Sequence, residues 1–365
     1  MRIGIVGDTH LGSTDYSRKR RADFSEAFIN AIDACLARNV DVICLLGDVF
    51  DSAATRRNVD GFAEVVSEIS QTLTALQKAG LPVVAIPGNH EFGRGREAGE
   101  LSVLEHLGFV RILRGTIFTI GNVSICGIPW QSRPEDVAQQ AGSLLQDCRS
   151  PRKILLMHNF IQGSRAIPEQ LWEVDPACCE GFDRVFVGHH HVYETVGNCV
   201  MPGSTEVQNM LDVSAKRIVF YDSETSDVQS AALPRTHRVV VLKYDLSLVP
   251  ASELSAHIGR DLDAQNCAGT FVYLRVAGAA PRNHSISKAE ILGLLREREL
   301  FDHCVELRYL TDAKTAEDSR RGASIEQILR RTFRGADLQK ARQYLQGSDS
   351  EKLFTDIRER ILSDH

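Results

Sequence analysis

Short apolar runs alternate with polar clusters through the first two thirds of the chain. Five of these runs, at residues 3–6, 42–46, 83–86, 154–157 and 185–187, are mostly β-branched and predict buried strands. Between the first three runs, apolar residues recur every three or four positions over residues 24–36 and 59–76, which indicates amphipathic helices. Strand, helix and strand in succession predict βαβ units with parallel strands.

A hairpin is predicted later in the same region. Residues 117–120 and 123–125 are apolar and are joined by Gly121 and Asn122, and a two-residue loop with glycine first is typical of a type II′ turn. Antiparallel strands therefore join the parallel ones. This mixture favours an α/β fold of the αββα type, a sandwich of two mixed sheets flanked by helices.

Carboxylate, amide and imidazole side chains follow each of the five predicted strands. They are Asp8 and His10, then Asp48, then Asn89, His90 and Glu91, then His158, and finally His189, His190 and His191. One such segment alone is more typical of a turn or a strand end. Because ligands bind at the carboxyl ends of strands in open α/β sheets, the five segments together indicate a cation site.

The number of candidate ligands indicates two metal ions. The first ion is assigned Asp8, His10 and His191, the second Asn89, His158 and His189, and Asp48 bridges them. Two ions sharing a carboxylate lie about 3.5–4 Å apart in hydrolases that cleave phosphoesters by in-line displacement. Oxygen and neutral nitrogen ligands without thiolate lead us to predict Mn²⁺, with iron, zinc and magnesium as alternatives.

These segments resemble the signature of the calcineurin-like metallophosphoesterase family, which reads D-x-H, G-D, G-N-H-[DE], H and G-H-x-H. The resemblance implies the same ligand assignment, and it implies that His90 is the catalytic histidine, which protonates the leaving oxygen or stabilises its charge. His190 is the variable middle residue of the last motif. Glu91 either orients His90 through a hydrogen bond or is a solvent-facing turn carboxylate.

Three longer segments resemble the SbcD-like branch of the family, the nuclease subunits of the SbcCD complex and its counterparts in double-strand-break repair. They are residues 8–12 (DTHLG), 47–51 (GDVFD) and 201–204 (MPGS), and the likeness covers about residues 1–235. It implies a DNA exonuclease and endonuclease for repair and recombination. The partners implied are DNA, an SMC-like ATPase subunit of the SbcC type and a second copy of the chain.

The sequence departs from this branch at two positions. Asp51 stands where some relatives carry a second catalytic histidine, so it either replaces that contribution or leaves it missing, and Glu91 replaces the usual aspartate. Gly203, in the Pro-Gly-Ser stretch, is either part of a turn or the point where backbone approaches the metal site closely. We favour the close approach, since glycine has no Cβ to block it.

A separate α/β module is predicted from near Pro234, with strands at residues 238–246, 270–276 and 304–310 and helices at 252–262 and 287–298. Ser287 and Glu290 have the spacing of a capping box, which supports the start of the second helix. We expect a nuclease domain at residues 1–233, a module at 234–310 and a helical segment at 311–365. The resemblance implies that the module caps the active site and positions DNA.

The helical segment has narrow apolar faces, which cannot bury themselves well alone. They comprise Ile325, Ile328, Leu329 and Phe333, followed by Leu353, Ile357 and Ile361. The segment therefore docks either on the parent domain or on a partner. By the resemblance, the partner would be the coiled coil of the ATPase, and we favour that alternative.

Composition is that of a globular enzyme, with 365 residues, 43% hydrophobic and 25% charged. No apolar run approaches the roughly 20 residues that span a bilayer, and Met1 leads directly into a strand without a signal-peptide pattern. We therefore expect a cytoplasmic protein without membrane association. Nine cysteines without a C-x-x-C pair fit reduced thiols rather than disulfides.

A net charge of −6 opposes free-standing binding to nucleic acid, because phosphate contacts supply most non-specific affinity. Basic side chains nevertheless follow the metal motifs, and they either form a phosphate-contacting rim or are ordinary surface charges. They are Arg18, Lys19, Arg20 and Arg21, then Arg56 and Arg57, then Arg94 and Arg96.

The alternative functions are a stand-alone phosphodiesterase or phosphatase and a non-catalytic scaffold, although a scaffold usually lacks part of the ligand set.

Overall fold

The structure is a computed structural model that describes residues 1–51, 59–91, 99–164, 173–210, 213–280 and 286–311. The chain divides into two compact units, which separate between Arg238 and Val239. The predicted helical segment from residue 312 onwards, with its apolar positions, lies outside the described residues.

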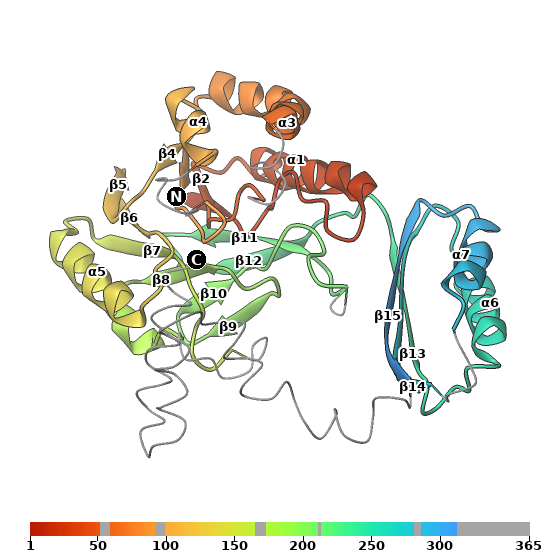
Figure 1. Cartoon of the computed structure of the whole chain (residues 1–365). Helices are drawn as coiled ribbons and strands as arrows, with labels where there is room; N and C mark the ends of the chain where they lie inside the picture. Colours follow the sequence, from red (N-terminus) through yellow and green to blue (C-terminus); the bar gives the residue numbers. More distant parts are fainter. Residues whose placement is uncertain (52–58, 92–98, 165–172, 211–212, 281–285, 312–365) are drawn as a thin grey trace, which may run out of the picture. The chain divides into compact units, whose positions relative to one another are not determined.

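The first sheet of unit 1 has six strands in the order β12-β11-β1-β2-β3-β4 (Figure 1). The strands are β1 (Arg2–Val6), β2 (Val42–Leu45), β3 (Val83–Ala85), β4 (Arg111–Ile112), β11 (Arg217–Asp222) and β12 (Val228–Ala232). Strands β1 to β4 are parallel, and β11 and β12 extend the sheet antiparallel. The parallel order of the first three predicted strands is confirmed.

The second sheet also has six strands, in the order β5-β6-β7-β8-β10-β9. They are β5 (Thr116–Ile120), β6 (Val123–Ile128), β7 (Arg152–His158), β8 (Arg184–Gly188), β9 (Glu194–Val196) and β10 (Cys199–Met201). The predicted hairpin is the antiparallel pair β5 and β6, and Gly121 in its loop has a φ of +56°. Strands β6, β7, β8 and β10 are parallel, so both sheets are mixed.

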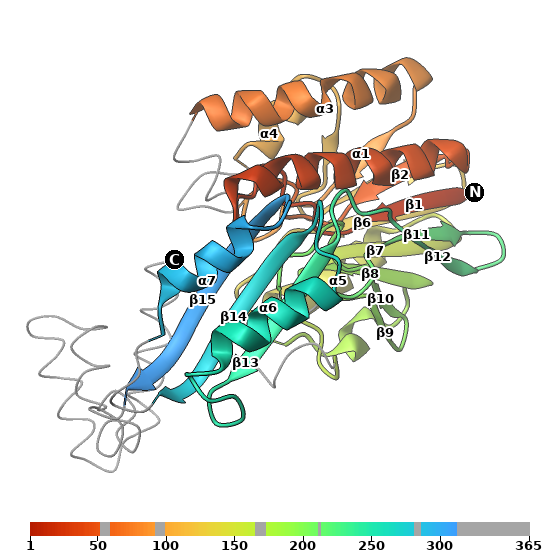
Figure 2. The same ribbon diagram turned by 90° about the vertical axis from the view of Figure 1, so that its right-hand side faces the viewer.

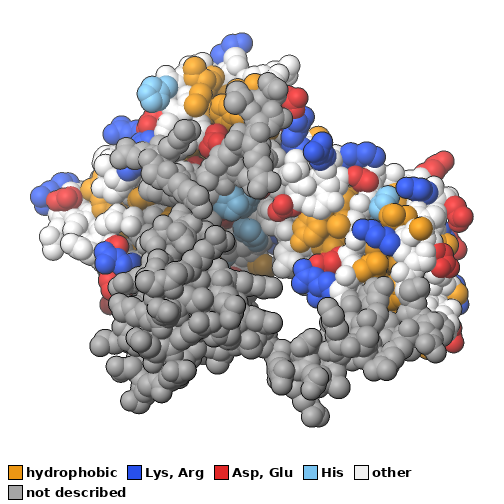
Figure 3. Space-filling view, viewed as in Figure 1, with side chains coloured by type: hydrophobic (Ala, Val, Ile, Leu, Met, Phe, Trp, Pro, Cys, Tyr) orange, Lys and Arg blue, Asp and Glu red, His pale blue; other side chains and the backbone are white. Residues whose placement is uncertain are grey.

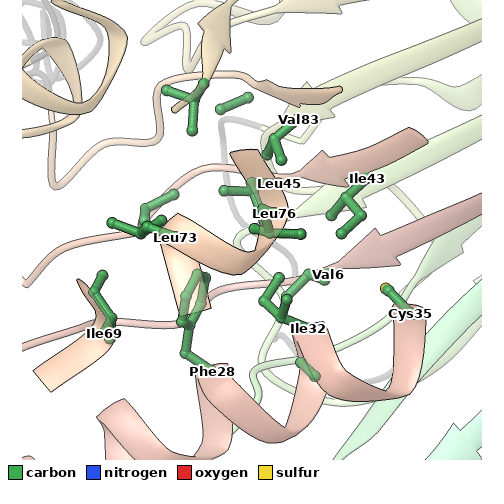
Figure 4. Packing of buried hydrophobic residues seen from close by; sticks show 14 of the residues in the cluster. Val6, Phe28, Ile32, Cys35, Ile43, Leu45, Ile69, Leu73, Leu76 and Val83 are labelled. Carbon is green, nitrogen blue, oxygen red and sulfur yellow. The ribbon is translucent and has the colours of Figure 1, made fainter. Parts of the chain in front are cut away.

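Helices cover the outer faces of the two sheets, as the αββα prediction requires (Figure 2). They are α1 (Arg21–Ala37), α3 (Val59–Ala79), α4 (Leu101–His106) and α5 (Pro134–Asp147), with the 3-10 turns η1 (Arg18–Arg20) and η2 (Pro176–Cys179). Phe28 and Ile32 of α1 pack with Leu73 of α3 against the first sheet (Figure 4). Ile3 and Ile5 point to the other face, where they meet Phe186 of the second sheet.

Unit 2 contains a three-stranded parallel sheet, β13-β14-β15. Its strands are β13 (Val239–Asp245), β14 (Phe271–Ala280) and β15 (Asp302–Thr311), and its helices are α6 (Leu254–Ala264) and α7 (Lys288–Arg296). Ile258 of α6 and Ile291 of α7 are buried with Leu274 of the central strand. The Ser287 side chain accepts a hydrogen bond from the amide of Glu290 at 3.2 Å, which caps α7. Among the helices of the described residues, none is both long and apolar enough to cross a membrane.

Candidate metal centre

The structure brings all seven predicted metal ligands together at one edge of unit 1. Asp8 and His10 follow β1, Asp48 follows β2, Asn89 follows β3, His158 ends β7, and His189 and His191 follow β8. The ligands thus come from the carboxyl ends of strands in both sheets. Histidine side chains lie in a hollow near the centre of the surface in Figure 3.

A first group of donor atoms comes from Asp8, His10 and His191, whose ligand atoms all lie within 4.8 Å of one another. The Nε2 atoms of His10 and His191 are 3.3 Å apart. Oδ2 of Asp48 lies 3.8 Å from Nε2 of His10. The imidazole nitrogens of His10 and His191 and the carboxylate oxygens of Asp8 and Asp48 are therefore close enough to bind one ion together.

A second group consists of Asp48, His158 and His189. Nδ1 of His158 donates to the carbonyl of Leu46 at 2.7 Å, which directs Nε2 inward. There Nε2 lies 3.3 Å from Oδ2 of Asp48 and 3.1 Å from Oδ1 of Asn89. A lone pair facing two oxygens requires a proton or a metal cation between them, so this donor set fits a divalent ion.

Backbone geometry at the centre is strained in the places where ligands are held. His10, Asp48 and His189 have φ values of 44°, 46° and 82°, in the left-handed region that side chains other than glycine seldom adopt. Such strain persists only where the surroundings enforce it. The amide of His189 donates to the carboxylate of Asp8 at 2.9 Å, and the amide of His90 donates to Oδ1 of Asp48 at 2.8 Å.

Burial sets the protonation of the imidazoles. It lowers the pKa of His10 to about 4 and that of His191 to about 3, and it lowers the pKa of His189 well below its usual range. Burial also lowers the pKa of His158, but the charge of Asp48 outweighs it and raises that pKa to about 9. Three of the imidazoles are therefore neutral at pH 7, and a metal ligand must be deprotonated.

His90 lies at the rim of this cluster, with 32% of its side chain exposed. Its ring contacts that of His10 edge-on, with the centroids 4.8 Å apart. Its Nδ1 lies 3.8 Å from Oδ1 of Asp51, a buried carboxylate. Burial lowers the pKa of His90, but the carboxylates of Asp51 and Asp48 outweigh burial and raise it to about 9.

One of the two roles considered for Glu91 from the sequence is wrong, and its role in orienting His90 stays a prediction. Its side chain is buried, so it is not a solvent-facing turn carboxylate. Its oxygens accept hydrogen bonds from three backbone amides, those of Asp48 at 2.9 Å, Phe50 at 3.0 Å and Gly88 at 2.8 Å. The carboxylate therefore fastens the turn after β2 to the turn after β3, while Asp51 faces His90.

The loop carrying Gly203 packs backbone against backbone beside Gly7 and His191, and its close approach to a metal ion stays a prediction. Gly203 has a φ of +83°, and a Cβ at Gly7 would lie 1.9 Å from its carbonyl oxygen. The amide of Thr205 donates to the carbonyl of Asp8 at 3.0 Å. Lys216, which the sequence analysis did not single out, is buried and donates from Nζ to the carbonyl of His191 at 2.9 Å.

Only some of the basic side chains predicted to form a phosphate-contacting rim are exposed in the structure. Arg18 and Lys19 are exposed, and Arg21 forms ion pairs with Glu64 and Glu68. Arg56, Arg57, Arg94 and Arg96 lie outside the described residues.

Arg20 is a correction to the predicted rim. Its side chain is fully buried, and its guanidinium donates to Glu206 at 3.2 Å and to the carbonyl of Val207 at 2.9 Å. A second carboxylate, that of Asp23, lies 3.9 Å from its Nε. Arg20 is therefore held inside unit 1 and is not available to contact a phosphate.

The model of the calcineurin-like phosphoesterase family matches residues 1–193. The chain belongs to this family. The matched residues include every member of both donor groups described above. The supporting loop at Gly203 lies beyond the match.

Curated proteins of known name are also similar to the chain. The DNA double-strand break repair protein Mre11 of Methanosarcina mazei is 28% identical over 80% of this chain and 47% of its own length. Mre11 of Haloferax volcanii is 30% identical over 82% of this chain and 68% of its own length. An uncharacterised metallophosphoesterase of Bacillus subtilis, YhaO, is 24% identical over 69% of this chain. The chain thus spans about half the length of the Methanosarcina mazei protein.

Proposed function

We propose that this chain is a metal-dependent DNA phosphodiesterase, both exonuclease and endonuclease, that acts in DNA repair and recombination. The observation that carries the proposal is the convergence of carboxylate, amide and neutral imidazole donors at one edge of unit 1. The family and this donor set support phosphoester hydrolysis. DNA as the substrate is supported by the similarity to Mre11.

The extent of that similarity supports a function that uses both units. The Methanosarcina mazei protein matches 80% of the chain, which is more residues than Met1–Arg238 contains. The match therefore continues into unit 2. In our proposal unit 2 is the capping module that positions DNA at the metal centre, a role that a phosphatase for small substrates does not need.

The metal centre is proposed to hold two divalent ions, most simply Mn²⁺. Asp8, His10 and His191 would hold one ion, Asn89, His158 and His189 would hold the other, and Asp48 would be a ligand shared by both. When bound, the ions supply Lewis acidity for an in-line displacement at phosphorus.

His90 is proposed as the acid that serves the leaving oxygen. Its side chain is 32% exposed, and its amide donates to Oδ1 of Asp48 at 2.8 Å, which holds the residue beside the proposed ligands. Asp51 at 3.8 Å holds the ring by charge. Proton donation by a positioned histidine contributes about 10²–10⁴-fold to the rate.

A cleavage assay tests the function. Purified chain with Mn²⁺ is given linear duplex DNA, single-stranded DNA and a chromogenic phosphodiester, and His189→Ala serves as the inactive control. We expect Mn²⁺-dependent cleavage of DNA that the variant lacks. Turnover of the chromogenic compound alone would replace the proposal with a phosphodiesterase for small substrates.

The partner is proposed to be an SMC-like ATPase that binds residues 311–365. The apolar spacing of this segment and the resemblance to the SbcD-like branch support the proposal. A chain that ends at Leu310 should fail to co-purify with the ATPase while keeping metal-dependent activity. Co-purification at full yield would contradict this assignment and leave the metal centre unaffected.

A further inference from the structure

His190, the variable residue between two proposed ligands, is almost completely buried, with 1% of its surface exposed. Its Nε2 accepts a hydrogen bond from the amide of Ile161 at 3.2 Å. Its Nδ1 lies 3.3 Å from Oγ of Ser164, and that hydroxyl donates to Oε2 of Glu194 at 2.7 Å. Both ring nitrogens of His190 are therefore hydrogen-bonded, although the family signature leaves the residue type at this position open.

The direction of these bonds fixes the tautomer. An amide N–H can donate only to a ring nitrogen with a free lone pair, so Nε2 of His190 carries no proton. The ring proton of the neutral imidazole is then on Nδ1, where it donates to Ser164. Because the Ser164 hydroxyl uses its hydrogen to donate a hydrogen bond to Glu194, its oxygen accepts from Nδ1, and the three bonds run in one direction.

These bonds join two loops that carry proposed ligands. Ile161 and Ser164 belong to the loop that follows His158, whereas His190 lies between His189 and His191. Within the described residues, no hydrogen bond is formed between the rings of His158 and His189, whose centroids are 5.0 Å apart. Their spacing therefore depends on the packing and bonds of the two loops.

An aromatic ring fills the space between the same loops. The ring centroid of Phe160 lies 4.0 Å from that of His189 and 5.8 Å from that of His190, edge to face in both cases. Phe160 restricts the rotation of the His189 ring on one side. Phe160 precedes Ile161 and His189 precedes His190 in the chain. The hydrogen bond from the Ile161 amide to His190 therefore also holds Phe160 and His189 near each other.

We propose that His190 is a positioning residue of the metal centre, which sets the spacing of His158 and His189 by holding Ile161 and Ser164. This inference rests on the proposed metal centre but not on the substrate. It predicts that loss of His190 weakens the binding of the second ion, the one assigned to His158 and His189. An imidazole that only fills space would affect stability and leave metal affinity unchanged.

Three variants and one control separate these possibilities. His190→Leu removes both bonds. His190→Gln keeps an acceptor within reach of the Ile161 amide, whereas Ser164→Ala removes the bond at Nδ1 together with the bond from Ser164 to Glu194. The control is His257→Leu, which alters a part-exposed histidine of α6 in unit 2.

Two measurements on full-length, metal-free protein provide the readout. Titration with Mn²⁺ by calorimetry should show that His190→Leu weakens one of two sites by about 10–100-fold, as removal of outer-shell partners does elsewhere. His190→Gln should recover most of this loss, Ser164→Ala should lie between them, and His257→Leu should match the parent. Nitrogen-15 spectra of histidine-labelled protein should show the Nδ1–H tautomer for His190, assigned by its absence from His190→Gln.

Several results would overturn the inference. They are an Nε2–H tautomer for His190, unchanged Mn²⁺ affinity in His190→Leu, or no recovery in His190→Gln. If His190→Leu does not fold, Ser164→Ala and His190→Gln decide through the same titration. Two bound Mn²⁺ ions without DNA cleavage would contradict the proposed function and leave the role of His190 intact.

Discussion

Oδ1 of Asp51 lies 3.8 Å from Nδ1 of His90, so a buried carboxylate faces the proposed catalytic histidine. The distance is that of an ion pair and exceeds that of a hydrogen bond. Asp51 is therefore suited to hold the His90 ring and favour its charged form.

Replacing Asp51 by Asn should reduce kcat by about 10–100-fold, because the neutral amide no longer holds the charged ring of His90. Mn²⁺ affinity and KM should change little, since Asp51 is not in the proposed ligand set. Steady-state kinetics and calorimetry on the same preparation give both values. Asp136→Asn, a surface carboxylate, is the control. An equal loss of Mn²⁺ affinity would instead make Asp51 a ligand.

Glu91→Gln should weaken the centre and destabilise unit 1. The carboxylate accepts hydrogen bonds from the amides of Asp48, Phe50 and Gly88, and an amide side chain turns an N–H toward at least one of them. A buried donor left unsatisfied costs about 1–3 kcal/mol. Chemical denaturation should show this loss of unfolding free energy, and calorimetry should show weaker Mn²⁺ binding.

Glu253→Gln is the matched control for this change, because 64% of the Glu253 side chain is exposed. Its unfolding free energy should equal that of the parent. If Glu91→Gln were as stable as this control and bound Mn²⁺ as well as the parent, the three amide bonds would not contribute to the centre.

The strands and most of the ligand positions could be predicted because their causes are local. An apolar run such as residues 42–46 is buried on both faces in the sheet, and the first polar residue after it marks the strand end. Asp48 lies there, shortly after the end of β2 at Leu45. Parallel strands then bring such ends to one edge whatever the details of the connecting helices.

The partners of Glu91 and the burial of Arg20 depend on long-range packing, which no local pattern reports. The amides that bond Glu91 lie up to 43 residues away in sequence. Arg20 meets Glu206 at a separation of 186 residues. A run of four basic residues is typical of a surface, and nothing within it distinguishes Arg20 from the exposed Arg18.

Arg20→Met should destabilise unit 1 strongly. The change leaves the buried carboxylate of Glu206 without its guanidinium partner, and removal of one partner of a buried ion pair costs about 3–5 kcal/mol. Chemical denaturation measures the loss. The control is Arg133→Met, since Arg133 pairs with Asp136 but is 63% exposed, and an exposed ion pair contributes little to stability. Similar losses in the two variants would contradict a structural role for Arg20.

Arg18→Ala combined with Lys19→Ala should weaken DNA binding without loss of stability, because both side chains are exposed on η1, close to the first metal motif in sequence. Each phosphate contact contributes about 0.9 to the slope of log affinity against log salt, so two lost contacts should reduce that slope by about 1.8. Fluorescence anisotropy with labelled duplex at several salt concentrations measures it. Binding should be followed in Ca²⁺ to avoid cleavage.

The control for this pair is Lys78→Ala combined with Arg149→Ala. Both side chains are exposed, and they precede β3 and β7, so they lie at the amino ends of strands, opposite the metal centre. Removing them changes the net charge by the same amount but should leave the salt slope unchanged. If both double variants lowered the slope equally, the DNA affinity would depend only on the total charge of the protein. Arg18 and Lys19 would then have no specific contact with DNA.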